Sequence, residues 1–188
     1  MRKRRMHLKD LSLNKDWTLF LDRDGVINER LVGDYVKIPD EFRFIDGVPE
    51  AIAKLSKIFG LIIIVTNQQG IGKELMTEED LRIIHDIMVT GIQEAGGRIN
   101  KIYHSPQLER DANALRKPNT GMALQAQKDF NEIDFEKSVM VGDGLHDMEF
   151  GRRLGMQRVF ISEKPDTHTN LFDFQFESLS AFSNSLEF

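Results

Sequence analysis

Two aspartates one residue apart, Asp22 and Asp24, follow a short apolar run and directly precede Gly25. Carboxylates at the end of a buried strand cost several kcal/mol unless they are paired or bind a metal ion. Asp143 follows another apolar run, and Mg²⁺ is the hard cation usually held by a few carboxylates, waters and a phosphate. The three acids therefore predict a magnesium site, although Asp and Gly also favour a simple turn.

Thr66 ends a second expected strand, and Lys117 lies in the loop after a third. A hydroxyl, an ammonium and backbone amides at one sheet edge form a cradle for phosphate. Separate segments of the chain then carry groups suited to the same chemistry, which disfavours the turn interpretation. Together they predict a site that handles a phosphoryl group.

Short apolar runs alternate along the chain with longer helical patterns, which is typical of a parallel sheet wrapped by helices. Ligands of such α/β folds bind beyond the carboxyl ends of the strands, where Asp22, Thr66 and Asp143 fall. We expect strands over 18–21, 61–66, 99–104, 138–142 and 158–162, helices over 49–59, 77–95, 120–130 and 145–154, and an edge strand over 172–176 followed by a helix over 177–186.

The chain has 188 residues, a net charge of −5 and no cysteine. This length suits a single domain over 16–188, preceded by a basic N-terminal extension over 1–15. Because the chain can form no disulfide, we expect a cytoplasmic protein. The acidic balance disfavours a nucleic-acid partner, and no apolar run approaches the roughly 20 residues that cross a membrane.

Four motifs, at 21–28, 65–72, 116–118 and 141–147, occur in the order found in the haloacid dehalogenase superfamily of aspartyl phosphotransferases, which the chain resembles from Trp17 to about Ser162. The resemblance implies a three-layer, Rossmann-like parallel sheet without a large cap domain. The wording of the motifs is most similar to the small capless phosphatases that act on heptose bisphosphate and on histidinol phosphate. Of these two kinds of phosphatase, the one that acts on heptose bisphosphate is favoured. A small phosphorylated sugar is therefore the expected partner.

The resemblance also implies a role for each motif residue. Asp22 would attack phosphorus and become a phospho-aspartate, and Asp24 would act as general acid and then as general base. Mg²⁺ would be held by Asp22, by the backbone carbonyl of Asp24 and by Asp143. Thr66 and Lys117 would hold the transferring group, with Lys117 countering its negative charge.

Other residues near the motifs are candidates for weaker roles. Asp147 would orient Lys117 or a water on the metal, although a solvent-facing acid in a first helical turn is an equal alternative. Arg116 would grip a phosphate, and a plain surface arginine is its alternative. Residues 29–35 are expected to form a flap over the site. The substrate-binding candidates are Arg30, Asp34, Tyr35, Asn67, Gln68, Gln69 and Arg116.

The chain departs from these relatives in the segment 103–115. They usually carry a zinc loop of three cysteines and a histidine there, whereas this segment has His104 and no cysteine. One histidine cannot make a four-ligand structural zinc site, so no zinc is expected.

Two readings other than a heptose phosphatase stay open. Histidinol phosphate or another phosphomonoester could be hydrolysed by the same groups. A receiver-like or phosphate-binding module would also gather acids, a threonine and a lysine at strand ends. A receiver, however, places its acceptor aspartate after the middle strand, and the intact Asp22 and Asp24 disfavour a module that only binds.

Overall fold

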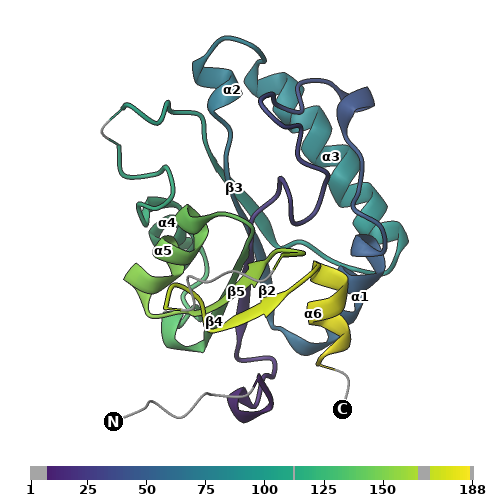
Figure 1. Ribbon diagram of the computed structural model, residues 1–188, viewed down its shortest axis with the longest axis vertical. Coiled ribbons are helices and arrows are strands. Elements are labelled where there is room, and N and C mark those ends of the chain that lie inside the picture. The colour runs from purple at the N-terminus through teal and green to yellow at the C-terminus, as the bar shows by residue number, and fades with distance from the viewer. Residues whose placement is uncertain (1–7, 112, 165–169, 187–188) are drawn as a thin grey trace.

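Six parallel strands form one sheet at the centre of the molecule, in the order β3-β2-β1-β4-β5-β6 (Figure 1). The computed structural model describes residues 8–111, 113–164 and 170–186. The strands are β1 (Thr18–Leu21), β2 (Leu61–Asn67), β3 (Lys101–Ser105), β4 (Ser138–Gly142), β5 (Gln157–Ile161) and β6 (Phe174–Phe176).

Helices cover both faces of this sheet and so create three layers. On one face α1 packs against both α3 and α6, and on the other α4 and α5 pack against the strands. The short α2 directly follows β2. The helices are α1 (Val48–Ile58), α2 (Gln69–Gly72), α3 (Glu78–Glu94), α4 (Gly121–Asp129), α5 (Leu145–Leu154) and α6 (Leu179–Asn184), with single 3-10 turns at Leu8–Leu11, Pro39–Glu41 and Phe135–Lys137.

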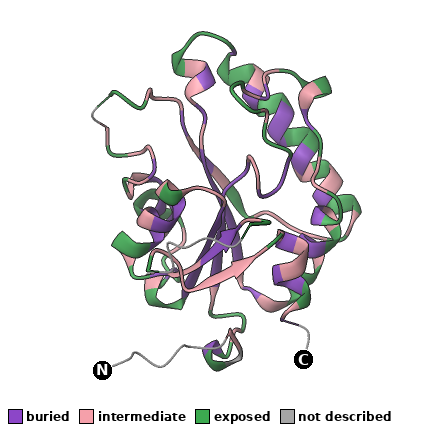
Figure 2. Cartoon of the chain, viewed as in Figure 1, coloured by how far each residue is buried: buried purple, intermediate pink, exposed green. Residues whose placement is uncertain are grey.

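The central strands are continuously apolar because both of their faces are covered. Every residue of β1 and β4 is buried, as the dark centre of Figure 2 shows. Leu19 and Leu21 contribute to the core under α1 and α3, whereas Phe20 contributes to the core under α4 and α5. This alternation follows from the two-residue period of a strand.

The pairing of β1 with its two neighbours positions the candidate chemistry. Leu21 lies opposite Ile64 of β2 and Val141 of β4. Asp22 continues the ladder, because its amide donates to the Val141 carbonyl oxygen at 2.9 Å. The chain therefore brings Asp22, Thr66 and Asp143 to one edge, as parallel strands require.

The sequence-based fold prediction is confirmed in its main features. Every expected strand and helix is present, with its ends within about two residues of those predicted, and no large cap domain stands between β1 and α1. The helix α2 was missed, because it has one turn and contains two glycines. None of the described helices is both long enough and apolar enough to cross a membrane.

The predicted N-terminal extension is described only from residue 8, so its basic cluster at 2–5 lies outside the described residues. In the described part, Leu11 is buried, and the Lys15 ammonium donates to the carbonyl oxygens of Ser56 and Phe59 at 2.8 and 3.2 Å. Lys15 therefore fixes this segment to the C-terminal end of α1.

The start of α3 offers a test of the fold. Thr77 Oγ1 accepts a hydrogen bond from the Asp80 amide at 3.1 Å, and Asp80 accepts one from the Thr77 amide at 2.8 Å. We expect Thr77→Ala to lower the free energy of unfolding by about 1 kcal/mol, because it leaves an amide at the helix start unpaired. Urea unfolding measures this change.

Thr90→Ala is the matched control, since Thr90 is exposed in the interior of the same helix. Alanine is the better helix former there, so this variant should be as stable as the wild type or slightly more so. Equal losses in the two variants would contradict the capping role.

Candidate active site

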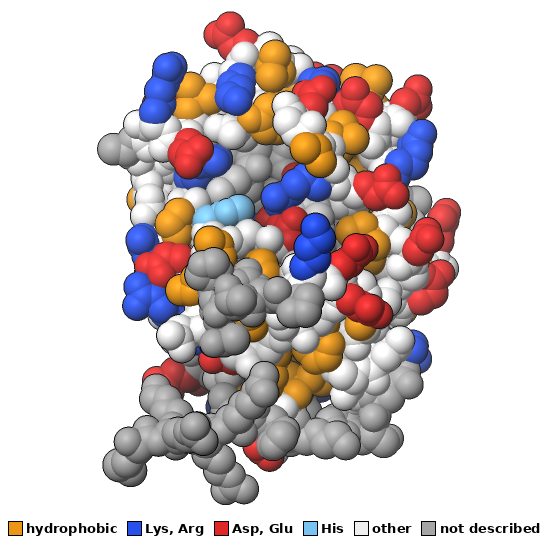
Figure 3. Space-filling model, in the orientation of Figure 1, with side chains coloured by type: hydrophobic (Ala, Val, Ile, Leu, Met, Phe, Trp, Pro, Cys, Tyr) orange, Lys and Arg blue, Asp and Glu red, His pale blue; other side chains and the backbone are white. Residues whose placement is uncertain are grey.

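A pocket of about 440 Å³ opens beyond the carboxyl ends of β1 and β2. Basic, acidic and histidine side chains meet around a hollow on the face drawn in Figure 3. The pocket is lined by Asp22, Asp24, Arg30, Leu31, Gly33, Asp34, Tyr35, Val36, Asn67, Gln69, Lys73, Arg116 and His146.

A buried lysine connects two buried aspartates on the inner side of this pocket. The Lys117 ammonium lies 2.9 Å from Asp22 Oδ1 and 2.6 Å from Asp147 Oδ1, and all three side chains are almost fully buried. Burial lowers the pKa of Lys117, but the two carboxylates outweigh burial and raise it. Lys117 is therefore held as an ammonium.

The two aspartates respond differently to this arrangement. Burial raises the pKa of Asp22, the negative charge of Asp147 raises it further, and Lys117 opposes both. Burial also acts on Asp147, but Lys117 and a hydrogen bond from the Gly144 amide keep the pKa of Asp147 below its ordinary value. Asp147 is buried rather than solvent-facing, which removes the alternative of an exposed helix-start acid.

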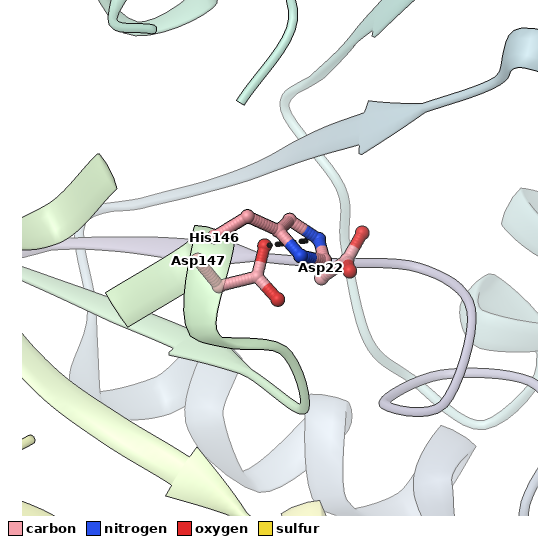
Figure 4. Close-up of side chains that lie close together, drawn as sticks. All are labelled: Asp22, His146 and Asp147. Atoms are coloured by element: carbon pink, nitrogen blue, oxygen red, sulfur yellow. Dashed lines mark ion pairs between the residues drawn. The ribbon is translucent and has the colours of Figure 1, made fainter. Parts of the chain in front are cut away.

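His146 completes a cluster with the same two acids (Figure 4). One ligand atom each from Asp22, His146 and Asp147 lies within 4.8 Å of the others, and His146 Nε2 is 3.5 Å from Asp147 Oδ1. The Lys117 ammonium already contacts both carboxylates. The proximity of these acids is therefore explained without a metal ion between them.

Asp143 provides a second, less enclosed carboxylate beside Asp22. Burial raises the pKa of Asp143 to about 7, the charge of Asp22 adds to the increase, and Arg30 opposes it. Asp143 Oδ1 and the Asp24 carbonyl oxygen both lie within hydrogen-bond distance of one nitrogen, Arg30 Nη2, so they are close enough to share a cation. With Asp22 they offer the hard oxygen donors that Mg²⁺ prefers, so these residues fit Mg²⁺.

Gly25 allows Asp143 to approach the turn after β1. A Cβ atom at this position would lie only 1.9 Å from Asp143 Oδ2, and the glycine has φ of +87°. Both the space and the backbone conformation therefore require glycine here.

The Asp24 carboxylate is held by donors from three directions. Arg23 binds it through both carboxylate oxygens, Asn28 donates to Oδ1 at 3.0 Å, and Gln68 donates to Oδ2 at 2.8 Å. Burial raises the pKa of Asp24, but Arg23 and these hydrogen bonds outweigh burial and lower it. Asp24 is thus an oriented carboxylate.

The residues after β2 divide between pocket and interior. Asn67 lines the pocket and fixes the Lys117 backbone, accepting from its amide at 2.9 Å and donating to its carbonyl oxygen at 3.1 Å. Gln68 is buried and donates to both Asp24 and Thr66 Oγ1. It therefore lies behind the pocket, although it was predicted to bind substrate.

The expected flap borders the pocket from the other side. Arg30, Asp34 and Tyr35 line it together with Gln69 of α2, and their binding of substrate stays a prediction. The Tyr35 hydroxyl accepts a hydrogen bond from the Lys73 ammonium at 2.8 Å. This contact joins the flap to the segment after α2.

The loop before Lys117 is organised by an asparagine in place of metal ligands. Asn113 Oδ1 accepts from the amides of Leu115 and Arg116 at 2.7 and 3.0 Å, and the Asn113 carbonyl oxygen accepts from Asn119 at 2.6 Å. This network leads the chain into Arg116, which lines the pocket.

Sequence reasoning missed two residues near the chemistry. Arg23 is fully buried and contacts His85 Nε2 at 3.4 Å as well as Asp24. Its only signal in the sequence was its place between two aspartates directly after an apolar strand. His146 lines the pocket. It stood inside the fourth motif, but nothing in its spacing indicated that its ring turns back toward Asp22.

His85 makes the protein less stable at acidic pH. Burial lowers its pKa to about 3, and the charge of Arg23 contributes. Because the folded protein resists protonation of His85, stability is full above the unfolded pKa of 6.5 and is lost as pH falls toward 3. This group alone should remove about 2–3 kcal/mol of unfolding free energy between pH 6.5 and 4.5.

His85→Gln should lose correspondingly less stability over that pH interval, since glutamine does not titrate and can still accept from Arg23. Urea unfolding at pH 6.5 and 4.5 measures the difference for both proteins. The same acid-induced loss in wild type and variant would show that His85 is not the group responsible.

The lysine between the two aspartates generates a second prediction. Lys117→Met leaves Asp22 and Asp147 buried without their cation, so the metal-free protein should lose roughly 3–5 kcal/mol of unfolding free energy at pH 8. Combining it with Asp147→Asn removes one unpaired charge and should recover at least about 1 kcal/mol. Urea unfolding in the presence of a chelator measures these two variants and Asp147→Asn alone, and a double-variant loss equal to the sum of the two single losses would contradict the coupling.

Comparison with known proteins gives a consistent assignment. A family model described as polynucleotide kinase 3 phosphatase matches residues 16–179. A D-glycero-alpha-D-manno-heptose-1,7-bisphosphate 7-phosphatase from Campylobacter jejuni is 34% identical over 170 residues, covering 90% of this chain and 95% of the relative. One from Mycobacterium bovis is 36% identical over 138 residues, covering 73% of each. A D-glycero-beta-D-manno-heptose-1,7-bisphosphate 7-phosphatase from Photorhabdus laumondii is 37% identical over 139 residues, covering 70% of this chain and 72% of the relative.

Solved structures agree with these relatives. The D,D-heptose 1,7-bisphosphate phosphatase from B. bronchiseptica, complexed with magnesium and phosphate, superposes with a TM-score of 0.79 at 27% identity, covering 90% of this chain and 97% of that one. The counterpart from Burkholderia thailandensis gives 0.62 at 26% identity, covering 89% and 96%. The chain therefore belongs to the polynucleotide kinase 3 phosphatase family within the haloacid dehalogenase superfamily, and it is a phosphatase.

Proposed function

We propose that this phosphatase removes a phosphate from a heptose 1,7-bisphosphate by way of a phospho-aspartate on Asp22. The observation that carries the proposal is the position of Asp22, next to the Lys117 ammonium at 2.9 Å and at the wall of the pocket. Relatives that cover most of the chain are named as phosphatases of this sugar.

In the first step one Asp22 oxygen attacks phosphorus, and the bond to the sugar oxygen breaks. Lys117 stays charged, so it can stabilise the oxygens of the transferring group. Thr66, fully buried with its hydroxyl held by Gln68, supports the same group from the end of β2. Bound Mg²⁺ would supply the remaining positive charge that lets an anionic nucleophile approach an anionic phosphate.

Asp24 would serve both steps. Its lowered pKa suits the second one, in which a carboxylate takes a proton from the water that hydrolyses the phospho-aspartate. The first step needs a proton on Asp24 to release the sugar oxygen. A phosphate dianion beside it would raise its pKa, because a neighbouring negative charge favours the protonated form.

The pocket suits a sugar that carries a second phosphate. Its volume of about 440 Å³ lies within the range of small-molecule sites, and Arg30, Lys73 and Arg116 contribute positive charge to its lining. No cysteine is available for a thiolate zinc site, so the proposal requires Mg²⁺ alone. A cytoplasmic location and a single domain over 16–188 stay predictions.

Phosphate release in the presence of Mg²⁺ tests the proposal. The panel contains heptose 1,7-bisphosphate, histidinol phosphate, common sugar phosphates and a 3′-phosphorylated oligonucleotide. We expect the heptose to give the highest kcat/KM. Asp22→Asn should lower kcat by roughly a thousandfold or more, as loss of a nucleophile does.

Asp16→Asn is the matched control, because Asp16 is exposed and precedes β1 at the end away from the pocket. It should retain full activity. Substantial turnover by Asp22→Asn would refute the nucleophile assignment. Preference for histidinol phosphate would refute the substrate but keep the mechanism.

A further inference from the structure

Arg30 bonds two of the three groups assigned to Mg²⁺. Its Nη2 atom lies 3.0 Å from the Asp24 carbonyl oxygen and 2.7 Å from Asp143 Oδ1. One nitrogen thus bridges a backbone oxygen and a carboxylate oxygen that come from opposite halves of the chain. A guanidinium takes the place expected for a cation.

Arg30 and a magnesium ion cannot both bind these two oxygens at the same time. Magnesium binds oxygen at about 2.0–2.1 Å and tolerates little distortion, so an ion on both oxygens would lie in the space that the Arg30 nitrogen approaches. Two positive charges at that separation also repel. Cation binding must therefore move the guanidinium.

The surroundings of Arg30 offer the displaced side chain another anion to bind. It stands on the flap, its side chain is 45% exposed, and it lines the same pocket as Asp22. A guanidinium binds phosphate oxygens in a bidentate geometry that matches its planar fork. A phosphate in the pocket is thus an anion that it could bind in place of Asp143.

We propose that Arg30 occupies the cation position of the metal-free enzyme and, when Mg²⁺ displaces it, turns to bind a phosphate group of the substrate. The second half of this proposal rests on the proposed function. Because the same side chain opposes the metal before displacement and attracts phosphate afterwards, each ligand favours binding of the other, and this coupling is reciprocal.

Magnesium affinity without substrate tests the first half. Isothermal titration calorimetry with Mg²⁺ compares the wild type with Arg30→Ala, in which the competitor is gone. A partly exposed ion pair predicts binding about two- to fivefold tighter, which corresponds to roughly 0.4–1 kcal/mol. Arg30→Lys keeps the charge but cannot reproduce the planar fork, so its affinity should lie between the two.

Arg116→Ala is the matched control for charge alone. Arg116 lines the same pocket, and its guanidinium contacts the Gln107 carbonyl oxygen at 3.5 Å. Removing it should change magnesium affinity less than removing Arg30. Equal affinity in wild type and Arg30→Ala, or an equal gain in Arg116→Ala, would overturn the displacement. Melting curves establish that each variant is folded.

Inorganic phosphate tests the second half. With Mg²⁺ saturating, we expect Arg30→Ala to bind phosphate several-fold more weakly than the wild type, even though it binds the metal more tightly. Unchanged phosphate affinity would refute the proposal that the displaced Arg30 binds phosphate. Neither titration uses a sugar, so inactivity of the wild type toward heptose bisphosphate would refute the proposed substrate and leave this result standing.

Discussion

The charge balance around Lys117 is the constraint on which the site depends. Two carboxylates that are almost fully buried share one buried ammonium, at 2.9 and 2.6 Å, and neither acid could stay ionised there alone. Asp147 keeps its charge in this arrangement, while the pKa of Asp22 remains raised. The lysine is thereby fixed by one acid and presented to the other. Asn67, which binds the Lys117 backbone on both sides, holds it at the required depth.

Charge balance also distinguishes Asp24 from Asp22, because the two carboxylates have different partners although only one residue separates them. Asp22 faces a lysine and other acids, whereas Asp24 faces Arg23, Asn28 and Gln68. In a continuing strand, residues two apart would share one face, but β1 ends at Leu21 and the chain bends directly after Asp22, so the two identical side chains enter different electrostatic surroundings. One pKa is raised and the other lowered, which is how paired carboxyl groups acquire separate roles.

Much of this was predictable from the sequence because the signals were local. Apolar runs located the strands, and the rule for parallel sheets located the pocket at their carboxyl ends. The side-chain partners were not predictable in the same way. Nothing in the run from Thr66 to Gln69 tells which glutamine turns inward, yet Gln68 is buried and Gln69 lines the pocket. Likewise, the contact of Arg30 with Asp143 joins residues 113 positions apart, and only the folded chain brings them together.

The position of β1 between β2 and β4 has a consequence for the order of folding. Its partners begin about forty and about 120 residues later along the chain. Contacts between segments so distant form slowly, because a long loop must close before they contribute. Asp22 and Asp24 precede all of these partners in the chain, and Asp143 and Asp147 reach them only after β4 has docked beside β1. A nascent chain that stops before β4 would therefore carry Asp22 without Asp143 and Asp147, and the site cannot assemble until the chain beyond Asp147 has been made.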